Sequence, residues 1–475
     1  MATTMLAPQA RAQEVRQRLR RANVDQETLV DVLRELNESE RRHEKKMSAA
    51  KSIERRIKEL QEELEAQVNE VARHPKVRKL ESTWRGLERL VNNTVHSKTL
   101  IVEVMDATEE SVRADLGSFS EGWRPMDKTN LYYYLYRRGL GVRGGHPYGA
   151  IVADFEIGPD EDGMSVLWQM SKIAKQAHAP FIAAASPQMF KMDDFADLNL
   201  VTADLRAIQV NDEKFNFNRW NDFRNEDFSC FAGLLVPRIL TRAPRSSERI
   251  VDARTDYVWG SPVYVYAEIL THAFAEYGWC SAIRGPHATI GDLPIHNLPG
   301  GDPATQVGPT NIVYDDSVEY QFDQLGFIAF CKELNSTKAV FPGGHSCHNP
   351  GSYSTPEAQA SAELSSRLPN VFARSRFAHA VKAMCRGNIG AFADEESLRK
   401  ELSNWLAQYK LDNPSAATSE QKARKPLLGY SVSVRQVEGH PGVFEASIDL
   451  SVHHQIEEVG VTMSLVAELS AADES

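Results

Sequence analysis

The apolar positions of residues 1–73 repeat at helical intervals. Except for Pro8, this stretch is free of glycine and proline, and it is dense in charge. Its clearest stripe consists of Ile57, Leu60, Leu64, Val68 and Val71. Basic side chains dominate the turns before this stripe, and glutamates dominate the turns that follow them. The pattern predicts an N-terminal helical arm over residues 1–73, either pairing with another helix as in a coiled coil or presenting a solvated face.

The segment 74–93, HPKVRKLESTWRGLERLVNN, carries a second apolar stripe. Its members are Leu80, Trp84, Leu87 and Val91, whose spacing places them on one side of an α-helix. Such a helix either packs on its own domain or belongs to an assembly. We expect the stripe to be core at the junction of arm and body, and we expect Arg85 and Arg89 to be free for ion pairs within or between subunits.

After this helix the apolar period changes, which predicts an α/β body over residues 74–425. Leu100, Val102 and Val104 alternate as in a strand, and so does YGAIVADFEI at 148–157. Helical patterns follow at 166–177, 263–279 and 395–410, and the run 180–186 is apolar throughout. The segments 285–310 and 341–357 are rich in Gly, Pro, His and Asn, so we expect them to be surface loops.

The segment 426–475 has the alternation of β-strands. Tyr430, Val432 and Val434 alternate with polar residues, a turn at Gly439–Gly442 follows, and a second alternating run predicts a hairpin. A third strand begins near Val461. Three strands with an apolar face need further packing, so they must cover the body or pair with another chain. The subunit-interface residues expected from this are Val432, Val434, Phe444, Ile448, Leu450, Val461, Met463 and Leu465.

Composition and charge limit the class of protein. The chain has 475 residues, of which 42% are hydrophobic, so it can bury a large core. A formal net charge of −11 argues against a general nucleic-acid binder. The N-terminus lacks the apolar core of a secretory signal, and no stretch approaches the roughly 20 apolar residues that span a bilayer. We therefore expect a cytoplasmic protein that binds no nucleic acid and inserts into no membrane.

The candidate chemical groups do not form an enzyme signature. The five cysteines are widely spaced and include no CxxC pair, so neither a disulfide framework nor a zinc knuckle is indicated. Asp154 and Glu156 point to the same side of one predicted strand, as paired catalytic carboxylates do. The cluster His345, Cys347 and His348 offers metal ligands, but no second cluster completes a tetrahedral shell. We expect no catalytic residue, cofactor or metal, with a metal-dependent hydrolase built on this cluster as the alternative from another class.

Several segments, taken in order, resemble the large subunit of the contractile sheath of the bacterial type VI secretion system, the TssC/VipB/EvpB family. They are HPKVRKLESTWRGLERLVNN (74–93), GGHPYGAIVADFEI (144–157), AHAPFIAAASP (177–187), EYGWCSAIRG (276–285), RLPNVFARSRFAHAVK (367–382) and NWLAQYKLDNP (404–414). The resemblance covers roughly residues 65–470. It implies the α/β sheath-protein fold and a structural role without enzymatic activity.

The resemblance also implies partners. The large subunit of that family forms a heterodimer with a small sheath subunit, and the heterodimers polymerise with other copies into a helical tube around an inner tube of stacked hexamers. The tube contracts to deliver effectors, and a baseplate attaches it to an envelope-spanning complex. The terminal strands of the family pair with neighbouring protomers by β-augmentation. By the same pattern, the helix with Arg399, Lys400 and Trp405 is a candidate contact with the inner tube.

Two segments depart from the family pattern. The chain has LSVHHQIEEVG at 450–460 where the family commonly shows LRPH followed by an aromatic residue and QLE. Residues 1–50 match no segment of the family, in which a helix near this end can be recognised by a AAA+ unfoldase that recycles sheaths. A sheath-like subunit of another contractile injection machine is therefore the nearest alternative.

Overall fold

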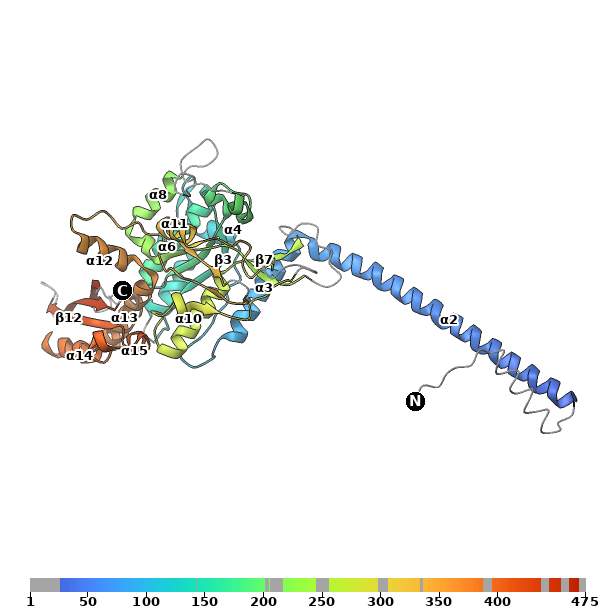
Figure 1. The fold of residues 1–475 in the computed structure, drawn as a ribbon. Coiled ribbons are helices and arrows are strands. Elements are labelled where there is room, and N and C mark those ends of the chain that lie inside the picture. Colours follow the sequence, from blue (N-terminus) through green and yellow to red (C-terminus); the bar gives the residue numbers. More distant parts are fainter. Residues whose placement is uncertain are drawn as a thin grey trace. The chain divides into compact units, whose positions relative to one another are not determined.

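The computed structural model describes residues 26–142, 144–200, 205, 217–244, 256–297, 306–333, 336–387, 395–436, 444–453 and 461–469. The chain divides into two compact units, Met1–His74 and Pro75–Ser475. The first contains helix α2 (Gln26–Arg73), and the second contains all the other described elements (Figure 1). The expected arm is thus helical from residue 26, whereas residues 1–25 and the expected turn at Gly439–Gly442 lie outside the described residues.

Helix α2 is 48 residues long and exposes its apolar stripe. Ile53, Ile57, Leu60 and Leu64 are 60%, 50%, 48% and 60% exposed. Their spacing of four, three and four residues is the a and d pattern of a coiled-coil seam. Exposed ion pairs such as Arg56–Glu59 and Lys58–Glu62 lie along the same helix, and each adds little stability.

A four-stranded parallel sheet forms the centre of the second unit. Its strands, in spatial order, are β3 (Ile151–Ile157), β4 (Phe181–Ala185), β5 (Ala232–Val236) and β9 (Phe327–Ala329). All five residues of β4 are buried, as are all five of β5. Both faces of a parallel sheet are normally covered by helices, which explains the uninterrupted apolar run at 180–186.

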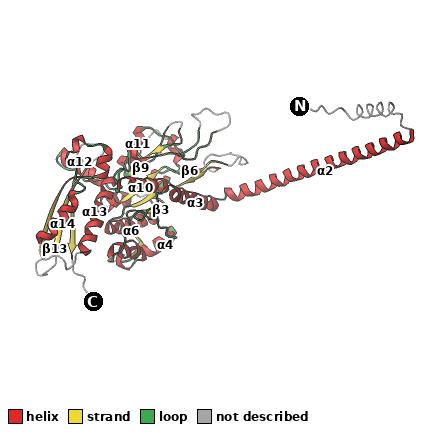
Figure 2. Cartoon of the chain, turned by 90° about the horizontal axis from the view of Figure 1, so that it is seen from below, coloured by secondary structure: helices red, strands yellow, loops and turns green. Residues whose placement is uncertain are grey.

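Helices cover this sheet on both faces (Figure 2). Phe181 and Ala183 of β4 pack with Met170 and Ile173 of α6 (Glu161–Ala177). The neighbouring Ile182 points the other way and joins the core of α10 (Val263–Tyr277). Helix α6 begins after the N-cap residue Asp160, whose carboxylate accepts a hydrogen bond from the Gly163 amide. It ends at His178, whose left-handed backbone conformation turns the chain toward β4.

The remaining elements before the C-terminal part surround this centre. The helices are α3 (Pro75–Asn93), α4 (Glu109–Leu116), α5 (Asn130–Tyr132), the π-helix η2 (Tyr133–Gly141), α8 (Asn218–Asn225) and α11 (Asp316–Gln324). Short 3-10 helices are η1 (Met126–Lys128), η3 (Pro187–Phe190), η4 (Phe195–Leu200), η5 (Asp227–Phe231) and η6 (Gly285–Ala288). Small sheets are β1 (Gly117–Ser118) with β2 (Gly122–Trp123), β6 (Ile239–Arg242) with β7 (Val258–Gly260), and β8 (Thr289–Ile290), β11 (Ala339–Val340) and β10 (Cys331–Lys332).

The C-terminal part is a helix-covered antiparallel sheet (Figure 1). Its strands, in order, are β12 (Leu427–Gln436), β13 (Phe444–Val452) and β14 (Val461–Leu469). Val432 lies opposite Ile448 and Tyr430 opposite Leu450, as the predicted hairpin requires. The helices of this part are α12 (Pro356–Ser366), α13 (Leu368–Gly387), α14 (Glu395–Ala407), η8 (Pro414–Ala416) and α15 (Ser419–Arg424).

The predicted α/β fold is confirmed, and three local predictions are wrong. The segment 285–310 is not a surface loop throughout, because it contains η6 and strand β8, and Ala288, Ile290 and Leu293 are buried. Residues 101–108 form no strand, because no other segment of the described chain pairs with them. The segment 341–357 is not a surface loop throughout, since Ser346 and Cys347 are completely buried. The Cys347 amide donates to the Ala232 carbonyl of β5, and the Ser346 hydroxyl donates to the Ser366 carbonyl, so this segment connects the central sheet to α12.

Candidate assembly surfaces

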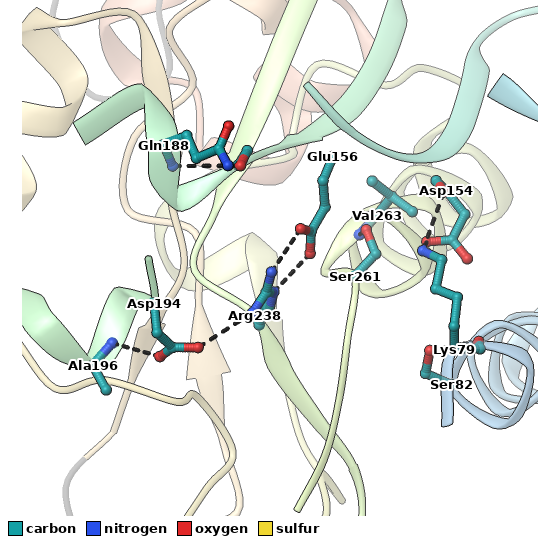
Figure 3. Close-up of polar contacts among 11 residues, drawn as sticks. Lys79, Ser82, Asp154, Glu156, Gln188, Asp194, Ala196, Arg238, Ser261 and Val263 are labelled. Atoms are coloured by element: carbon teal, nitrogen blue, oxygen red, sulfur yellow. Dashed lines mark hydrogen bonds and ion pairs between the residues drawn. The ribbon is translucent and has the colours of Figure 1, made fainter. Parts of the chain in front are cut away.

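The two carboxylates of β3 bind different cationic partners (Figure 3). Asp154 accepts from Lys79 (3.3 Å) and Thr83, both on α3. It also accepts from the Tyr264 hydroxyl of α10 at 3.3 Å, and burial together with this carboxylate raises the tyrosine pKa. Asp154 thus fastens α3 to the edge strand of the central sheet.

Glu156 forms a bidentate ion pair with Arg238, which precedes β6. The distances are 2.6 Å from Nε and 2.7 Å from Nη2, and Asp194 lies 3.3 Å from Nη1 (Figure 3). Burial alone lowers the pKa of Arg238, but the hydrogen bonds and charge of Glu156, helped by Asp194, raise it. The predicted carboxylate pair is therefore engaged in two separate structural contacts.

Helix α3 is held on α10 by a buried ion pair. Arg89 donates to both oxygens of Glu268, at 2.8 Å and 3.3 Å, and the Glu268 residue is 3% exposed. Asn93 donates to the same carboxylate at 2.8 Å. The remaining Arg89 donors reach the carbonyls of Gly291 and Asp292, both at 3.0 Å. Arg89 thus makes its ion pair within the chain, which is one of the two kinds of pairing expected for it.

Arg85 is also paired within the chain. It lies 2.9 Å from Glu81, which in turn accepts from Arg242 of β6 at 2.6 Å. Burial alone raises the pKa of Glu81, but the hydrogen bonds from Arg242 and Arg85 lower it. For the Arg89 contact, a sequence signal was available in α10: Glu268 is the one acidic residue in the otherwise apolar run 263–270, and a buried carboxylate needs a cationic partner.

Small residues bring α3 close to α10. The buried residues of α3 are Ser82, Gly86 and Leu90. A Cβ atom at Gly86 would lie 2.2 Å from Cδ2 of Tyr264, so glycine is what permits this approach. The face of α3 that packs on the body is therefore the one with small side chains.

The apolar stripe of α3 lies on the opposite side and is exposed. Leu80 and Trp84 are 58% and 62% exposed, Val91 is 38% exposed, and Leu87 is half-buried. The prediction that this stripe is core is wrong, because the helix buries its small-residue face instead. A tryptophan and two aliphatic side chains along one exposed helix face are typical of a contact with another chain.

The apolar face of the C-terminal sheet is buried within the chain. Ile448 and Leu450 are completely buried with Leu398, Leu402 and Leu406 of α14. Ile448 and Leu450 were therefore wrongly expected at a subunit interface. Val432, Val434 and Phe444 pack partly against the same core and are half-buried, so their interface role stays a prediction. Val461, Met463 and Leu465 lie on β14, whose side chains are outside the described part.

What the C-terminal sheet leaves open is its backbone edges. In the order β12-β13-β14, the outer sides of β12 and β14 have no further strand in the described chain. The Gln436 amide donates to Glu395 at 2.7 Å and so points away from β13. Because backbone groups alternate along an antiparallel strand, the amides of Val434 and Val432 point to the same outer side. Leu427, at the start of β12, already pairs with Tyr409 and Leu411, so the available hydrogen-bonding groups of this edge are those around Val432 and Val434.

Helix α14 exposes two of its three expected contact residues. Arg399 and Lys400 both pair with Glu396, at 2.7 Å and 3.4 Å, on the exposed side of the helix. Trp405 packs edge-on against Phe377 and Tyr409 within the chain's own core. Of the predicted set, Arg399 and Lys400 remain as candidates for contact with another molecule.

The alternative metal site on His345, Cys347 and His348 is not assembled. His345 lies 3.2 Å from Asp323, and its pKa is lowered to about 3 by burial and by Arg367, Arg224 and Arg284. Burial raises the pKa of Cys347 to about 12. His348 contacts the Ser229 hydroxyl and the Glu226 carbonyl. Throughout the described segments, no group of three or more His, Cys, Asp and Glu residues could hold a metal ion.

The described helices include none with the length and apolar character needed to cross a membrane. The chain matches the EvpB/VC_A0108 (VipB) tail sheath N-terminal domain over residues 54–348 and the tail sheath gpW/gp25-like domain of the same family over residues 357–469. It is also 34% identical, over 442 residues, to the type VI secretion system sheath protein TssC1 of Pseudomonas aeruginosa PAO1, covering 90% of this chain and 88% of that protein. The fold and the matches together define a structural protein of a tail sheath. The chain belongs to the EvpB/VC_A0108 tail sheath family.

Two chains of the anti-feeding prophage show a weaker likeness. One comes from its baseplate, with a TM-score of 0.33 and 9% identity, and covers 67% of this chain. The other comes from its helical sheath in the contracted state, with a TM-score of 0.30, 10% identity and the same coverage of this chain. This chain spans 64% and 65% of their lengths.

Proposed function

We propose that this chain is the large subunit of a type VI secretion sheath. It forms a heterodimer with a small sheath subunit, and the heterodimers polymerise into a helical tube around an inner tube and contract to drive effector delivery. The observation that carries the proposal is the family match, which runs through both the body and the C-terminal strand segment and agrees with 34% identity to a named sheath protein.

Three open surfaces support this assembly role. The coiled-coil seam of α2 leaves Ile57, Leu60 and Leu64 about half exposed or more, which suits a partner helix. The stripe of Leu80, Trp84 and Val91 on α3 offers a second apolar contact. The outer edge of β12 offers backbone pairing to a strand of a neighbouring protomer. When such contacts repeat from subunit to subunit without closing into a ring, they generate a helical filament.

The other partners follow from the same role. Arg399 and Lys400 lie on an exposed helix side that suits an acidic surface of the inner tube. The sheath would join a baseplate and, through it, an envelope-spanning complex, with the sheath itself in the cytoplasm. A AAA+ unfoldase would recycle contracted sheaths by recognising a helix near the N-terminus. If a variant that lacks residues 1–40 were still disassembled, this recognition site would be ruled out.

The test is co-expression of the full chain with the small sheath subunit encoded beside it. We expect the two proteins to co-purify and to form tubules in negative-stain electron microscopy. The variant Val432→Pro removes an amide from the outer edge of β12, so we expect the heterodimer to remain while tubules are lost. Its matched control, Val432→Ala, trims the side chain and keeps the amide, and it should form tubules. Failure of the wild-type pair to co-purify would contradict the proposal.

A further inference from the structure

The π-helix η2 presents tyrosine and arginine side chains together at the surface. Its exposed members, called the η2 face below, are Tyr133, Tyr134, Arg137 and Arg138. Tyr133 is 53% exposed and Tyr134 is 43% exposed. Each arginine follows one of these tyrosines by four residues, so the four side chains are neighbours on one side of the helix. π-Helices are rare and frequently mark functional sites.

The buried side of η2 holds this face in place. Leu135 packs into the core around α6. The chain that follows the helix returns very close to it, because a Cβ atom at Gly145 would lie 2.2 Å from the Gly139 carbonyl oxygen. A Cβ atom at Gly139 would in turn lie 2.8 Å from the His146 carbonyl oxygen. Such close packing leaves η2 little freedom, so its outer side chains are preorganised for a partner.

The two arginines keep their charge available. In the part of the chain that the structure describes, neither Arg137 nor Arg138 forms an ion pair with a carboxylate. The Arg137 guanidinium instead lies 5.8 Å from the centre of the Tyr132 ring, a cation–π contact. Tyrosine and arginine are the side chains that most often dominate the energy of protein interfaces. The η2 face therefore suits a partner that offers carboxylates beside apolar groups.

Helix α11 carries a face with this complementary chemistry. Asp316 and Tyr320 lie four residues apart on α11, and Val313 lies just before the helix; these three residues are the α11 face. Val313 is 53% exposed and Tyr320 is 57% exposed. Among the described residues, Asp316 has no cationic partner. Its charge acts on Glu319 instead, whose pKa is raised by burial first and then by Asp316.

Other acidic surfaces fit the η2 face less well. Asp162, Glu161 and Asp227 each pair with a cationic side chain of the same chain. Glu109 and Glu110 begin α4, which packs on α5 beside η2, so they lie on the same side of the body as the η2 face. The α11 face combines an unpaired carboxylate with exposed apolar side chains.

The two faces lie on opposite sides of the body. Helix η2 packs on α5 and α6 and leads into β3, which is one edge strand of the central sheet. Helix α11 leads into β9, which is the other edge strand. Figure 2 shows α11 and β9 on one side of the body and α4 and α6 on the other. A contact between two different faces on opposite sides joins copies head to tail and continues as an open filament.

We propose that the η2 face is a docking site for the α11 face of a second copy of this chain. The two arginines meet Asp316 of the next copy, and the two tyrosines pack against its Val313 and Tyr320. The proposal rests on the proposed function, because the contact repeats from copy to copy along the sheath. It adds a side-chain contact between the bodies of successive copies to the backbone edge of the C-terminal sheet.

Exchange of charge between the two faces tests this contact in the full-length chain co-expressed with the small sheath subunit. Arg138→Glu places a carboxylate near Asp316 of the next copy, and Asp316→Arg places an arginine near Arg138. We expect each single variant to co-purify with the small subunit and to need at least about tenfold more protein than the wild type to form tubules. The chain with both substitutions has opposite charges at every contact, so we expect it to assemble near the wild-type concentration.

The matched control carries Lys98→Glu and Asp412→Lys, which make the same two kinds of charge change at exposed positions outside both faces. We expect it to form tubules at the wild-type concentration. Single variants that assemble like the wild type, or a double variant that stays defective, would overturn the inference. Single variants that no longer co-purify would identify the small subunit as the occupant and overturn it too. Failure of the wild-type pair to co-purify would overturn the proposed function as well.

Discussion

Arg89 of α3 and Glu268 of α10 form a bidentate ion pair in which the Glu268 residue is 3% exposed. The two residues are 179 positions apart in the sequence, and Asn93 binds the same carboxylate. This contact decides which side of α3 packs on the body. With the Arg89 side and Gly86 turned inward, the stripe that contains Trp84 is left at the surface, where another chain can reach it.

Breaking this pair should destabilise the folded chain. Glu268→Ala leaves Arg89 partly buried without its carboxylate, so we expect the free energy of unfolding to fall by about 3 kcal/mol. Urea unfolding of the purified chain measures this loss. The control is Glu88→Ala, which removes an exposed acidic residue beside Arg89 on α3 and should be neutral. Equal midpoints for the two variants would show that the ion pair does not hold α3.

Closing the space at Gly86 should also be costly. The Cβ of Gly86→Ala would lie 2.2 Å from the Tyr264 ring, which is itself bonded to Asp154. We expect a loss of about 1–3 kcal/mol from overpacking. Gly149→Ala is the matched control, because its Cβ meets nothing within 4 Å. Thermal unfolding that is unchanged in Gly86→Ala would mean that α3 can move away from α10 freely.

Trp84 should matter for assembly and not for folding. Because it is 62% exposed, we expect Trp84→Ala to change the free energy of unfolding by less than about 0.5 kcal/mol. The same variant should bind the small sheath subunit more weakly in a titration. Leu90→Ala, on the buried side of α3, should instead cost about 2–5 kcal/mol of stability. A large loss of stability in Trp84→Ala would restore the interpretation of this stripe as core.

Acid should destabilise the fold through a buried histidine pair. The rings of His178 and His379 lie 6.1 Å apart. Burial first, and then Lys382, His379 and Arg374, lower the pKa of His178 to about 3. Burial lowers the pKa of His379 to about 4. The hydrogen bond to the Ala177 carbonyl opposes this shift, and the charges of Arg376 and Lys382 add to it. Both rings therefore stay neutral in the folded chain at pH values where they are protonated in the unfolded chain.

The sign of the pH effect follows from these lowered values. Above about pH 6.5 both states hold neutral rings and the stability is fully present. As the pH falls from about 6.5 toward 4, the unfolded chain gains protons that the folded chain does not, and each histidine removes up to about 1.4 kcal/mol per pH unit. Urea midpoints measured across this range should show a smaller slope in His379→Gln than in the control His96→Gln. Identical slopes would contradict the assignment.

The sequence predicts the elements with strong periodicity and misses what depends on distant partners. Two predicted helices, at 263–279 and 395–410, are confirmed, and so is the hairpin between Tyr430 and Leu450. Each has a strong periodic pattern of apolar residues, which local packing determines. The stripe of Leu80 and Trp84 was misassigned, since periodicity identifies an apolar face but not what covers it. Gly86 determines the buried face of α3 only through its close approach to Tyr264, which lies 178 residues later in the sequence.

The interface residues show the same limit. Alternation along β12 and β13 correctly indicated one covered face, but α14 provides the cover, so Ile448 and Leu450 are internal. What is left for another chain is the backbone edge, which has no sequence signature of its own. The reverse holds at 101–107, where the residues have the composition of a strand and the described chain lacks the partner.

We expect this chain to complete its C-terminal sheet with a strand from another chain. A cryo-electron microscopy reconstruction of tubules assembled from the co-expressed subunits tests it most directly. We expect a strand from a neighbouring chain to be hydrogen-bonded along the outer edge of β12, facing the amides of Val432 and Val434. Tubules in which that edge faces solvent, with subunits joined by side-chain contacts alone, would contradict it.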